Sequence, residues 1–200
     1  MPNLFEYESS LLSSGIRFIC GVDEAGRGPL AGPVCAGACI PNLSEIIEGV
    51  NDSKKLTEKK RENLYEILKD NCISHKTVFI DANVIDEINI LNATKLAMKE
   101  AILSMFPLPE MVLIDAVKLE NIPYNTQSII HGDAISYCIA AASIFAKVER
   151  DRLMLKYAEM YPEYGFEKHK GYGSKHHIEM IKKYGPCPIH RTTFIKNFFK

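Results

Sequence analysis

Residues 19–34, ICGVDEAGRGPLAGPV, are the most informative part of the sequence: an apolar run leads into two adjacent carboxylates, Asp23 and Glu24. Arg27 follows between Gly26 and Gly28. The apolar residues predict a buried strand, and the Gly and Pro residues after the acids predict a turn. Acidic residues at the end of a strand, beside a glycine-flanked arginine, can hold a hard metal ion next to a phosphate. The pattern therefore indicates metal-dependent phosphodiester chemistry.

Patterns along the rest of the chain predict a mixture of strands and helices. Strands are expected at residues 17–23, 34–40, 75–80, 111–114 and 127–130. Helices are expected at residues 56–69 (with Thr57 as N-cap), 82–105 (with a break near 89–92), 134–148, 151–161 and 174–183. Residues 162–173 are expected to form an irregular loop. This mixture favours an α/β fold, and 200 residues fit one domain spanning 1–200.

Two further acids follow the same local pattern as Asp23 and Glu24. Asp115 closes the apolar run 111–114, and Asp133 opens a helical segment. Ligands bind beyond strand ends in open α/β sheets, and Mg²⁺ and Mn²⁺ prefer oxygen ligands. Two such ions about 4 Å apart can stabilise the attacking and the leaving oxygen of an in-line displacement.

Each acid also has a purely structural alternative. Asp133 alone could be a helix cap, Asp115 a turn residue, and Asp23 the ion-pair partner of Arg27. Glu24 poses a geometric problem, because neighbouring residues on a regular strand point to opposite faces. Both acids serve one site only if the strand ends or bulges there, which Gly26 would permit, or if one contributes its backbone carbonyl.

Basic and aromatic residues could bind the other parts of a nucleic acid. The tripeptide 26–28 can bring backbone N–H groups close to a phosphate while the arginine donates a fork of hydrogen bonds. Lys54 and Lys55 could contact phosphate, although solvation explains them better. Tyr172, flanked by glycines in HKGYG, can stack on a sugar or base, or pack against the core. The spacing of His169, His176, His177 and His190 matches no zinc pattern.

Charge is unevenly distributed along the chain. Residues 1–70 carry a net charge of −3 and residues 71–146 a net charge of −4, whereas residues 147–200 carry +6 (12 Lys+Arg against 6 Asp+Glu). This distribution is compatible with contact between the last quarter and a polyanion, although solvated basic helices are common and explain it as well. The six cysteines contain no CxxC pair, which favours reduced thiols in a cytoplasmic protein. Neither a signal peptide nor a membrane span is expected.

Several long motifs, in order, resemble the bacterial ribonuclease HII family of type 2 ribonucleases H. The match covers nearly the whole chain: GVDEAGRGPLAGP (21–33), DSKKLT (52–57), LIDA (113–116), GDAIS (132–136), IAAASI (139–144), AKV (146–148), HKGYG (169–173) and HR (190–191). The resemblance implies an RNase H-like fold, with a mixed five-stranded sheet flanked by helices. It also implies a helical C-terminal substrate-binding part over about residues 150–200.

The same resemblance implies an activity and a role for each site residue. The activity is cleavage of RNA in RNA–DNA hybrids, and 5′ of a lone ribonucleotide in duplex DNA, giving 5′-phosphate and 3′-hydroxyl ends. Two Mg²⁺ or Mn²⁺ ions are expected. The carboxylates implied to bind them are Asp23, Glu24, Asp115 and Asp133. The residues implied to contact substrate are Gly26, Arg27, Gly28, Tyr172, Lys54 and Lys147.

Some residues depart from the family pattern or leave alternatives open. His131 stands where the family pattern predicts lysine, which would weaken one phosphate contact. The short segment before Asp23 and the aspartate at position 133 favour type HII over the related type HIII.

Two alternatives to the ribonuclease HII function are a non-catalytic hybrid-binding module and a general nuclease or polynucleotidyl transferase. A monomer is expected. The C-terminal tail has the residue spacing of a sliding-clamp-binding peptide, at Thr192, Ile195, Phe198 and Phe199. Packing of the tail against the rest of the protein explains this spacing better.

Overall fold

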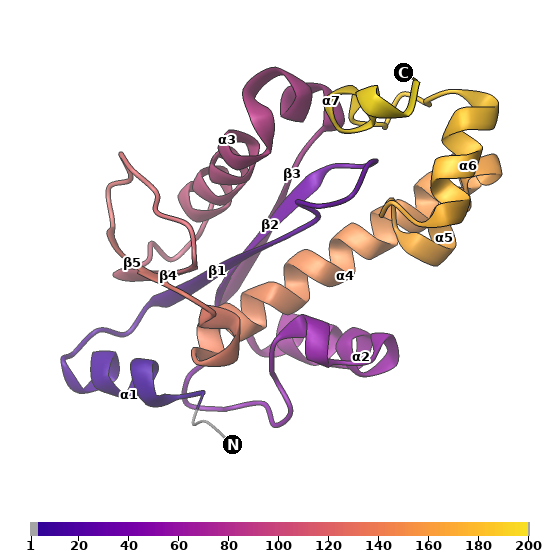
Figure 1. Ribbon diagram of the computed structural model, residues 1–200. Coiled ribbons are helices and arrows are strands. Elements are labelled where there is room, and N and C mark those ends of the chain that lie inside the picture. The colour runs from indigo at the N-terminus through magenta and orange to yellow at the C-terminus, as the bar shows by residue number, and fades with distance from the viewer. Residues whose placement is uncertain (1–3, 200) are drawn as a thin grey trace.

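A five-stranded mixed sheet forms the centre of the molecule. The computed structural model describes residues 4–199. The strands are β1 (Ile19–Ala25), β2 (Val34–Ile40), β3 (Ser74–Ile80), β4 (Met111–Asp115) and β5 (Asn125–Ile129). Their order is β3-β2-β1-β4-β5, with β1 antiparallel to β2 and parallel to β4 (Figure 1). The predicted mixed five-stranded sheet is confirmed.

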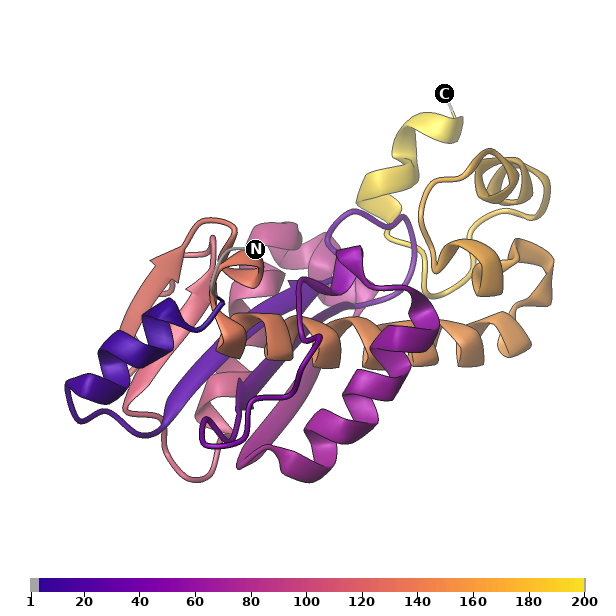
Figure 2. The same cartoon turned by 90° about the horizontal axis from the view of Figure 1, so that it is seen from below.

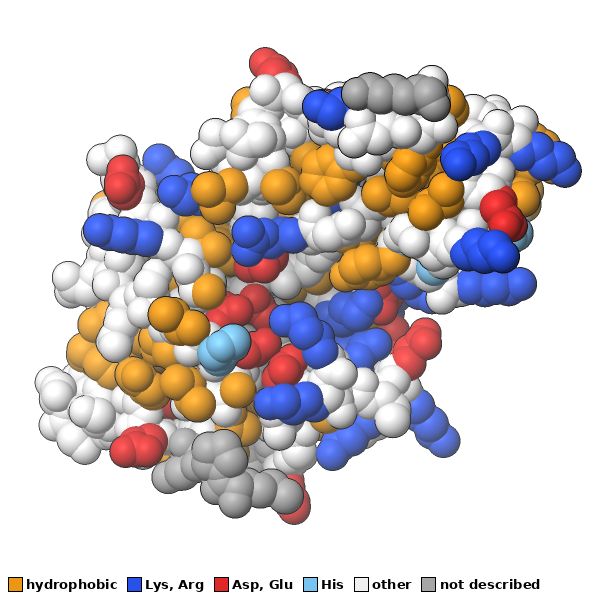
Figure 3. All heavy atoms as spheres, in the orientation of Figure 1, with side chains coloured by type: hydrophobic (Ala, Val, Ile, Leu, Met, Phe, Trp, Pro, Cys, Tyr) orange, Lys and Arg blue, Asp and Glu red, His pale blue; other side chains and the backbone are white. Residues whose placement is uncertain are grey.

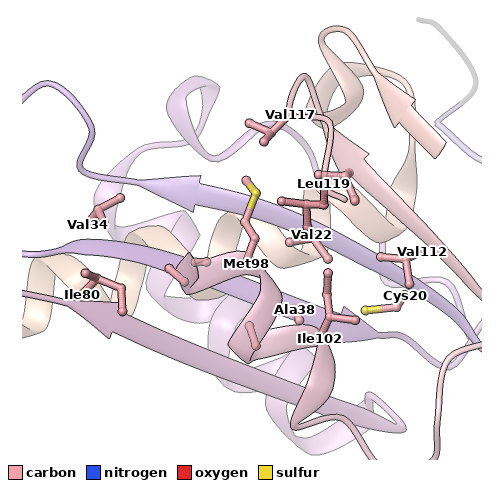
Figure 4. Packing of buried hydrophobic residues seen from close by; sticks show 14 of the residues in the cluster. Cys20, Val22, Val34, Ala38, Ile80, Met98, Ile102, Val112, Val117 and Leu119 are labelled. Atoms are coloured by element: carbon pink, nitrogen blue, oxygen red, sulfur yellow. The ribbon is translucent and has the colours of Figure 1, made fainter. Parts of the chain in front are cut away.

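Helices cover both faces of this sheet. The longer ones are α1 (Glu6–Ser13), α2 (Glu58–Asn71), α3 (Ala82–Leu103) and α4 (Tyr137–Met160). One core cluster joins α3 to the sheet and includes Val22, Met98 and Ile102 (Figure 4). A second cluster joins α4 and α2 on the other face. None of the helices in the described part of the chain is both long and apolar enough to cross a membrane.

The contact between α4 and β1 explains why this helix is rich in alanine. A Cβ atom on Gly21 would lie 2.0 Å from the backbone of Cys138, so glycine is required for the helix to cross the strand so closely. A second close approach brings α4 onto β2, since a Cβ atom on Gly37 would lie 2.5 Å from the carbonyl oxygen of Ala142 and 3.3 Å from Cβ of Ala146. This close packing fixes the start of α4 beside the middle of β1.

The C-terminal quarter forms short helices at one end of α4. They are η3 (Pro162–Tyr164), α5 (Phe166–His169), α6 (Lys175–Tyr184), α7 (Thr192–Ile195) and η4 (Lys196–Phe199). They lie at the opposite end of the molecule from α1 (Figures 1 and 2). Their own cluster of buried residues includes Met154, Tyr164, Phe166 and Ile181.

Several predicted boundaries were wrong. The strand expected at 17–23 begins at Ile19 and continues to Ala25, so that it contains both acids. The helical stretch expected from 134 to 161 is the helix α4, which begins three residues later than predicted, at Tyr137, because Ser136 caps it. The expected loop at 162–173 contains η3 and α5. The break predicted near 89–92 is confirmed, since Asn89 has a φ of 65° inside α3, and Thr57 caps α2 as predicted.

Candidate active site

Three carboxylates from separate elements meet at one edge of the sheet. Asp23 lies in β1, Asp115 ends β4, and Asp133 lies in the short helix η2 (Gly132–Ala134). Each offers an oxygen within 4.8 Å of an oxygen of the other two. Val22 pairs with Ile114 across the parallel strands β1 and β4, so the next residue of each strand is one of these acids. Strand register therefore explains why Asp23 and Asp115 meet.

Backbone contacts hold Asp115 and Asp133 together. The N–H of Gly132 donates to Oδ1 of Asp115 over 2.7 Å, which joins the end of β4 to η2. The N-cap of α4 is Ser136, whose side chain accepts a hydrogen bond from the N–H of Ile139, so Asp133 does not cap this helix. The capping alternative for Asp133 is thus wrong.

Burial and like charge make this group of acids costly to ionise. Burial, followed by the charges of Glu24 and Asp115, raises the pKa of Asp23 well above its usual value. Burial and the charges of Asp52 and Asp115 also raise the pKa of Asp133. A divalent cation would offset this repulsion, and an all-oxygen donor set is the kind that Mg²⁺ and Mn²⁺ bind. The residues present therefore fit such an ion.

Glu24 follows Asp23 in β1, but it is not one of the three carboxylates that cluster. β1 continues through Ala25, which pairs with Cys35, so the strand does not end early at the acids. Oε1 of Glu24 lies 3.5 Å from Nη1 of Arg27, while its Oε2 is buried without a hydrogen-bond partner among the described residues. Arg27 therefore pairs with Glu24 and not with Asp23, the partner expected in the structural alternative. Burial raises the pKa of Glu24 despite the opposing charge of Arg27.

The tripeptide 26–28 forms a tight loop directly after these acids. Gly26 has a φ of +91°, and a Cβ atom there would lie 1.9 Å from Nε of Arg150. No other residue fits this position without displacing the arginine. Gly26 is buried, whereas Arg27 and Gly28 are exposed.

A cleft of about 210 Å³ connects this loop with the remaining predicted substrate contacts. It is lined by Glu24, Ala25, Gly26, Arg27, Gly28, Ser53, Lys54, Lys147 and Tyr172. Tyr172 is 46% exposed. Its ring lies next to Gly28, because a Cβ on that glycine would be 3.6 Å from Cε1 of the ring. Tyr172 is thus available for stacking. Figure 3 shows acidic side chains at the centre of one face, with lysine and arginine side chains beside them.

The two lysines of the cleft differ in their surroundings. Nζ of Lys54 lies 3.4 Å from Oδ2 of Asp133. Burial would lower the pKa of Lys54, but the charges of Asp23, Asp133 and Asp52 outweigh burial and raise it. Nζ of Lys147 donates to Asp151 over 2.7 Å, and burial lowers its pKa. His131, which stands where lysine was expected, is exposed, and its backbone has a left-handed conformation with a φ of 56°.

Sequence reasoning missed two buried groups behind the cleft. Arg150 and Arg191 are fully buried, and both donate to backbone carbonyls of the loop region. His177 and His190 are also buried, and their Nε2 atoms lie 3.0 Å apart. The HR motif was the only sequence signal for Arg191 and His190. Arg150 has no local signal, because arginine inside a helix is usually exposed.

Comparison with known proteins identifies the family. The sequence model of the family described as Ribonuclease HII matches residues 20–197. The chain belongs to the ribonuclease HII family. A Ribonuclease HII from Caldicellulosiruptor bescii is 57% identical over 195 residues, which are 98% of this chain and 95% of that protein.

Solved structures of related enzymes share the fold. The ribonuclease H2 from Pyrococcus horikoshii OT3 aligns with a TM-score of 0.76 and 29% identity, over 91% of this chain and 99% of that chain. The RNase HII in the PCNA:RNase HII complex from Archaeoglobus fulgidus aligns with a TM-score of 0.74 and 25% identity, over 91% and 97% of the two chains. The RNase H-like fold predicted from the resemblance is confirmed.

Family membership establishes the class of activity. A ribonuclease HII is an RNase H, a hydrolase and endonuclease that acts on RNA–DNA hybrids. The family depends on divalent metal ions, and the aspartate cluster of this chain can bind one. A purely non-catalytic hybrid-binding module is therefore excluded.

Proposed function

We propose that this ribonuclease HII cuts the phosphodiester bond 5′ of a ribonucleotide, both in RNA–DNA hybrids and at a lone ribonucleotide in duplex DNA. The products are a 5′-phosphate and a 3′-hydroxyl. The observation that carries the proposal is the convergence of Asp23, Asp115 and Asp133 within 4.8 Å, beside a cleft lined by a glycine-flanked arginine and an exposed tyrosine.

Four acids hold the metal in this proposal. Asp23, Asp115 and Asp133 provide the shared oxygens, and Glu24 contributes the buried Oε2 that has no protein partner among residues 4–199. Two Mg²⁺ or Mn²⁺ ions bound there would supply the charge neutralisation and water activation that in-line phosphodiester hydrolysis requires. The carboxylates would hold these ions in place, so that the positive charge meets the reacting phosphate and its developing negative charge.

The residues that line the cleft beside the acids recognise the substrate. Backbone N–H groups of the 26–28 loop and the Arg27 guanidinium bind the phosphate next to the ribose. The Tyr172 ring stacks at the RNA–DNA junction, a role that its exposure and its contact with Gly28 support. The 2′-hydroxyl is the group that distinguishes ribose from deoxyribose, so these two elements must sense it.

The remaining contacts position the duplex. Lys54 and Lys147 line the cleft and bring positive charge to the phosphate backbone. The net charge of +6 on residues 147–200 supports a role for the C-terminal part as the docking surface. We further propose that the enzyme works as a monomer in the cytoplasm, where its six free thiols would stay reduced.

The test uses three duplexes of one sequence: an RNA–DNA hybrid, a DNA duplex with one ribonucleotide, and an all-DNA duplex. With Mg²⁺ or Mn²⁺, the first two are cut, and end mapping of the second gives a single cut 5′ of the ribonucleotide. EDTA abolishes both reactions. Cleavage of the all-DNA duplex would favour a general nuclease or polynucleotidyl transferase, and an uncut single-ribonucleotide duplex would limit the activity to hybrids.

The C-terminal tail favours packing over clamp binding. Asp86 accepts hydrogen bonds from the N–H and hydroxyl of Thr192 and of Thr193. Ile195 is buried at 2% exposure, and Phe198 packs against the C-terminal cluster. A sliding clamp would have to displace these contacts. Co-elution with a clamp that is lost on deletion of residues 192–200 would show that it does so.

A further inference from the structure

Two buried arginines lie beneath the 26–28 loop without an acidic partner. Arg150 and Arg191 are both 0% exposed. Among residues 4–199, no carboxylate oxygen lies within 4.0 Å of either guanidinium. Burial lowers the pKa of both, that of Arg191 to about 9, which still leaves it charged at neutral pH. The nearest acidic influences are indirect: the charge of Asp151 acts on Arg150 and that of Asp86 acts on Arg191 without an ion pair. Burial of a charge that makes no direct ion pair is costly.

Both guanidinium groups donate only to backbone carbonyls. Arg191 donates to the carbonyls of Gly26, Arg27 and Gly32 at 2.6 to 2.9 Å. Arg150 donates to the carbonyls of Pro33, Ala31 and Lys170 at 3.0 to 3.2 Å. The pair thus fixes both ends of the segment 26–33. Through Lys170 it also reaches the turn that carries Tyr172.

These contacts determine which way the peptide groups of the loop face. In a trans peptide the C=O of one residue and the N–H of the next point in opposite directions. The peptide bonds 26–27 and 27–28 are trans, and their carbonyls point inward to Arg191. The N–H groups of Arg27 and Gly28 therefore point outward, toward the cleft these exposed residues line. Within residues 4–199 neither N–H donates to a protein acceptor.

We propose that Arg191 and Arg150 are positioning residues, which hold the 26–28 peptide groups so that two N–H donors face a substrate phosphate, and that this phosphate adds negative charge near two cations that make no direct ion pair within the protein. The inference rests on the proposed function, since it assigns the cleft to a nucleic-acid phosphate. It adds a reason why the loop is already ordered before substrate binds: the oriented peptide dipoles and the two cations beneath them favour an anion at the same point.

A direct test follows the backbone amides and requires no cleavage. We titrate ¹⁵N-labelled protein with inorganic phosphate at a fixed Mg²⁺ concentration, which neutralises the nearby acids. Saturable shifts of the Arg27 and Gly28 amide signals are expected. An unresponsive pair of amides in the wild-type protein would overturn the inference, even if the enzyme cuts normally. Conversely, shifted amides with no cleavage of ribonucleotide substrates would leave the inference standing and refute the proposed function.

The arginine side chain is tested by Arg191→Lys, which keeps the charge but loses the planar fork that reaches three carbonyls. We expect phosphate affinity to fall at least tenfold, and kcat/KM to fall roughly 10²-fold because the reacting groups are displaced. The matched control is Arg152→Lys on α4, where the arginine binds the surface residues Glu62 and Glu66.

Folding is checked by circular dichroism, so that loss of structure is not mistaken for loss of position. If Arg191→Lys does not fold, Arg150→Lys takes its place, because that arginine holds the same segment from the other side. A folded variant with wild-type phosphate binding and wild-type kcat/KM would contradict the proposal. Recovery of activity in Arg191→Ala on addition of guanidinium, but not of urea, would support it.

Discussion

Replacing Asp23 by asparagine should stabilise the metal-free protein while it abolishes activity. Asp23 is 2% exposed, and its oxygens lie within 4.8 Å of those of Asp115 and Asp133. Two unit charges at that distance repel by about 3.5 kcal/mol at an effective dielectric constant of 20. Asparagine has nearly the same shape but no charge, so the substitution removes two of the three repulsive pairs.

The measurable gain is smaller than the full repulsion, because the wild-type site escapes part of it by retaining protons. We expect Asp23→Asn to gain about 2 kcal/mol at pH 8 without metal, which for 200 residues raises the melting temperature by about 4–8 °C. Mg²⁺ or Mn²⁺ should then stabilise the wild type and have little effect on the variant. Differential scanning calorimetry with and without the cation measures both effects.

The sign of the pH dependence follows from the raised pKa of Asp23. Between the ordinary value of 3.8 and the higher folded-state pKa, the folded protein binds more protons than the unfolded chain. The stability of the metal-free wild type should therefore fall as pH rises through this window. Asp23→Asn should show a flatter profile, since it lacks this group.

A surface substitution provides the control for this experiment. Asp70→Asn changes an exposed aspartate near the end of α2 and should leave melting temperature, metal response and activity unchanged. If Asp23→Asn is less stable than the wild type without metal, or keeps near-normal turnover with Mg²⁺, the reasoning from charge repulsion and metal binding is wrong.

Three further predictions concern substrate recognition and the stability of the 26–28 loop. Tyr172→Ala should lose more activity on a duplex with a single ribonucleotide than on a hybrid, measured as the ratio of the two kcat/KM values. Equal losses would show that Tyr172 does not recognise the RNA–DNA junction. Gly26→Ala should cost about 1–3 kcal/mol from backbone strain alone, measured by urea unfolding, whereas Gly28→Ala should be nearly neutral because its Cβ would meet only an ordinary 3.6 Å contact. Duplex affinity should fall with salt, with a log–log slope of about −0.9 per neutralised phosphate, and a flat titration would argue against the C-terminal part as the docking surface.

Local patterns were sufficient to predict most of the strands and the acids at their ends, whereas the mixed five-stranded sheet and the assignment of the acids as metal ligands came from the family resemblance. β-branched and apolar runs identified the strands, and Asp23 and Asp115 each stand at or near the end of such a run. The structure brings these two together through the β1–β4 register. Asp133 was recognised by its place at the start of a helical segment, although the helix itself begins four residues later.

Long-range contacts account for what the sequence could not predict. The start of α4 depends on Glu8, which is buried and accepts hydrogen bonds from Ser136 and from the N–H of Cys138, about 130 residues away. Arg150 reaches carbonyls 117 and 119 residues away, and Arg191 reaches the loop across 165 residues. No local pattern encodes such partners, because a backbone carbonyl belongs to every residue type.

The metal site is tested most directly by a crystal of the protein soaked with Mn²⁺ and measured by anomalous diffraction. We expect anomalous density between the carboxylates of Asp23, Asp115 and Asp133, with a Glu24 oxygen turned toward it. Well-ordered carboxylates with no ion between them, or an ion bound elsewhere in the cleft, would contradict the central claim.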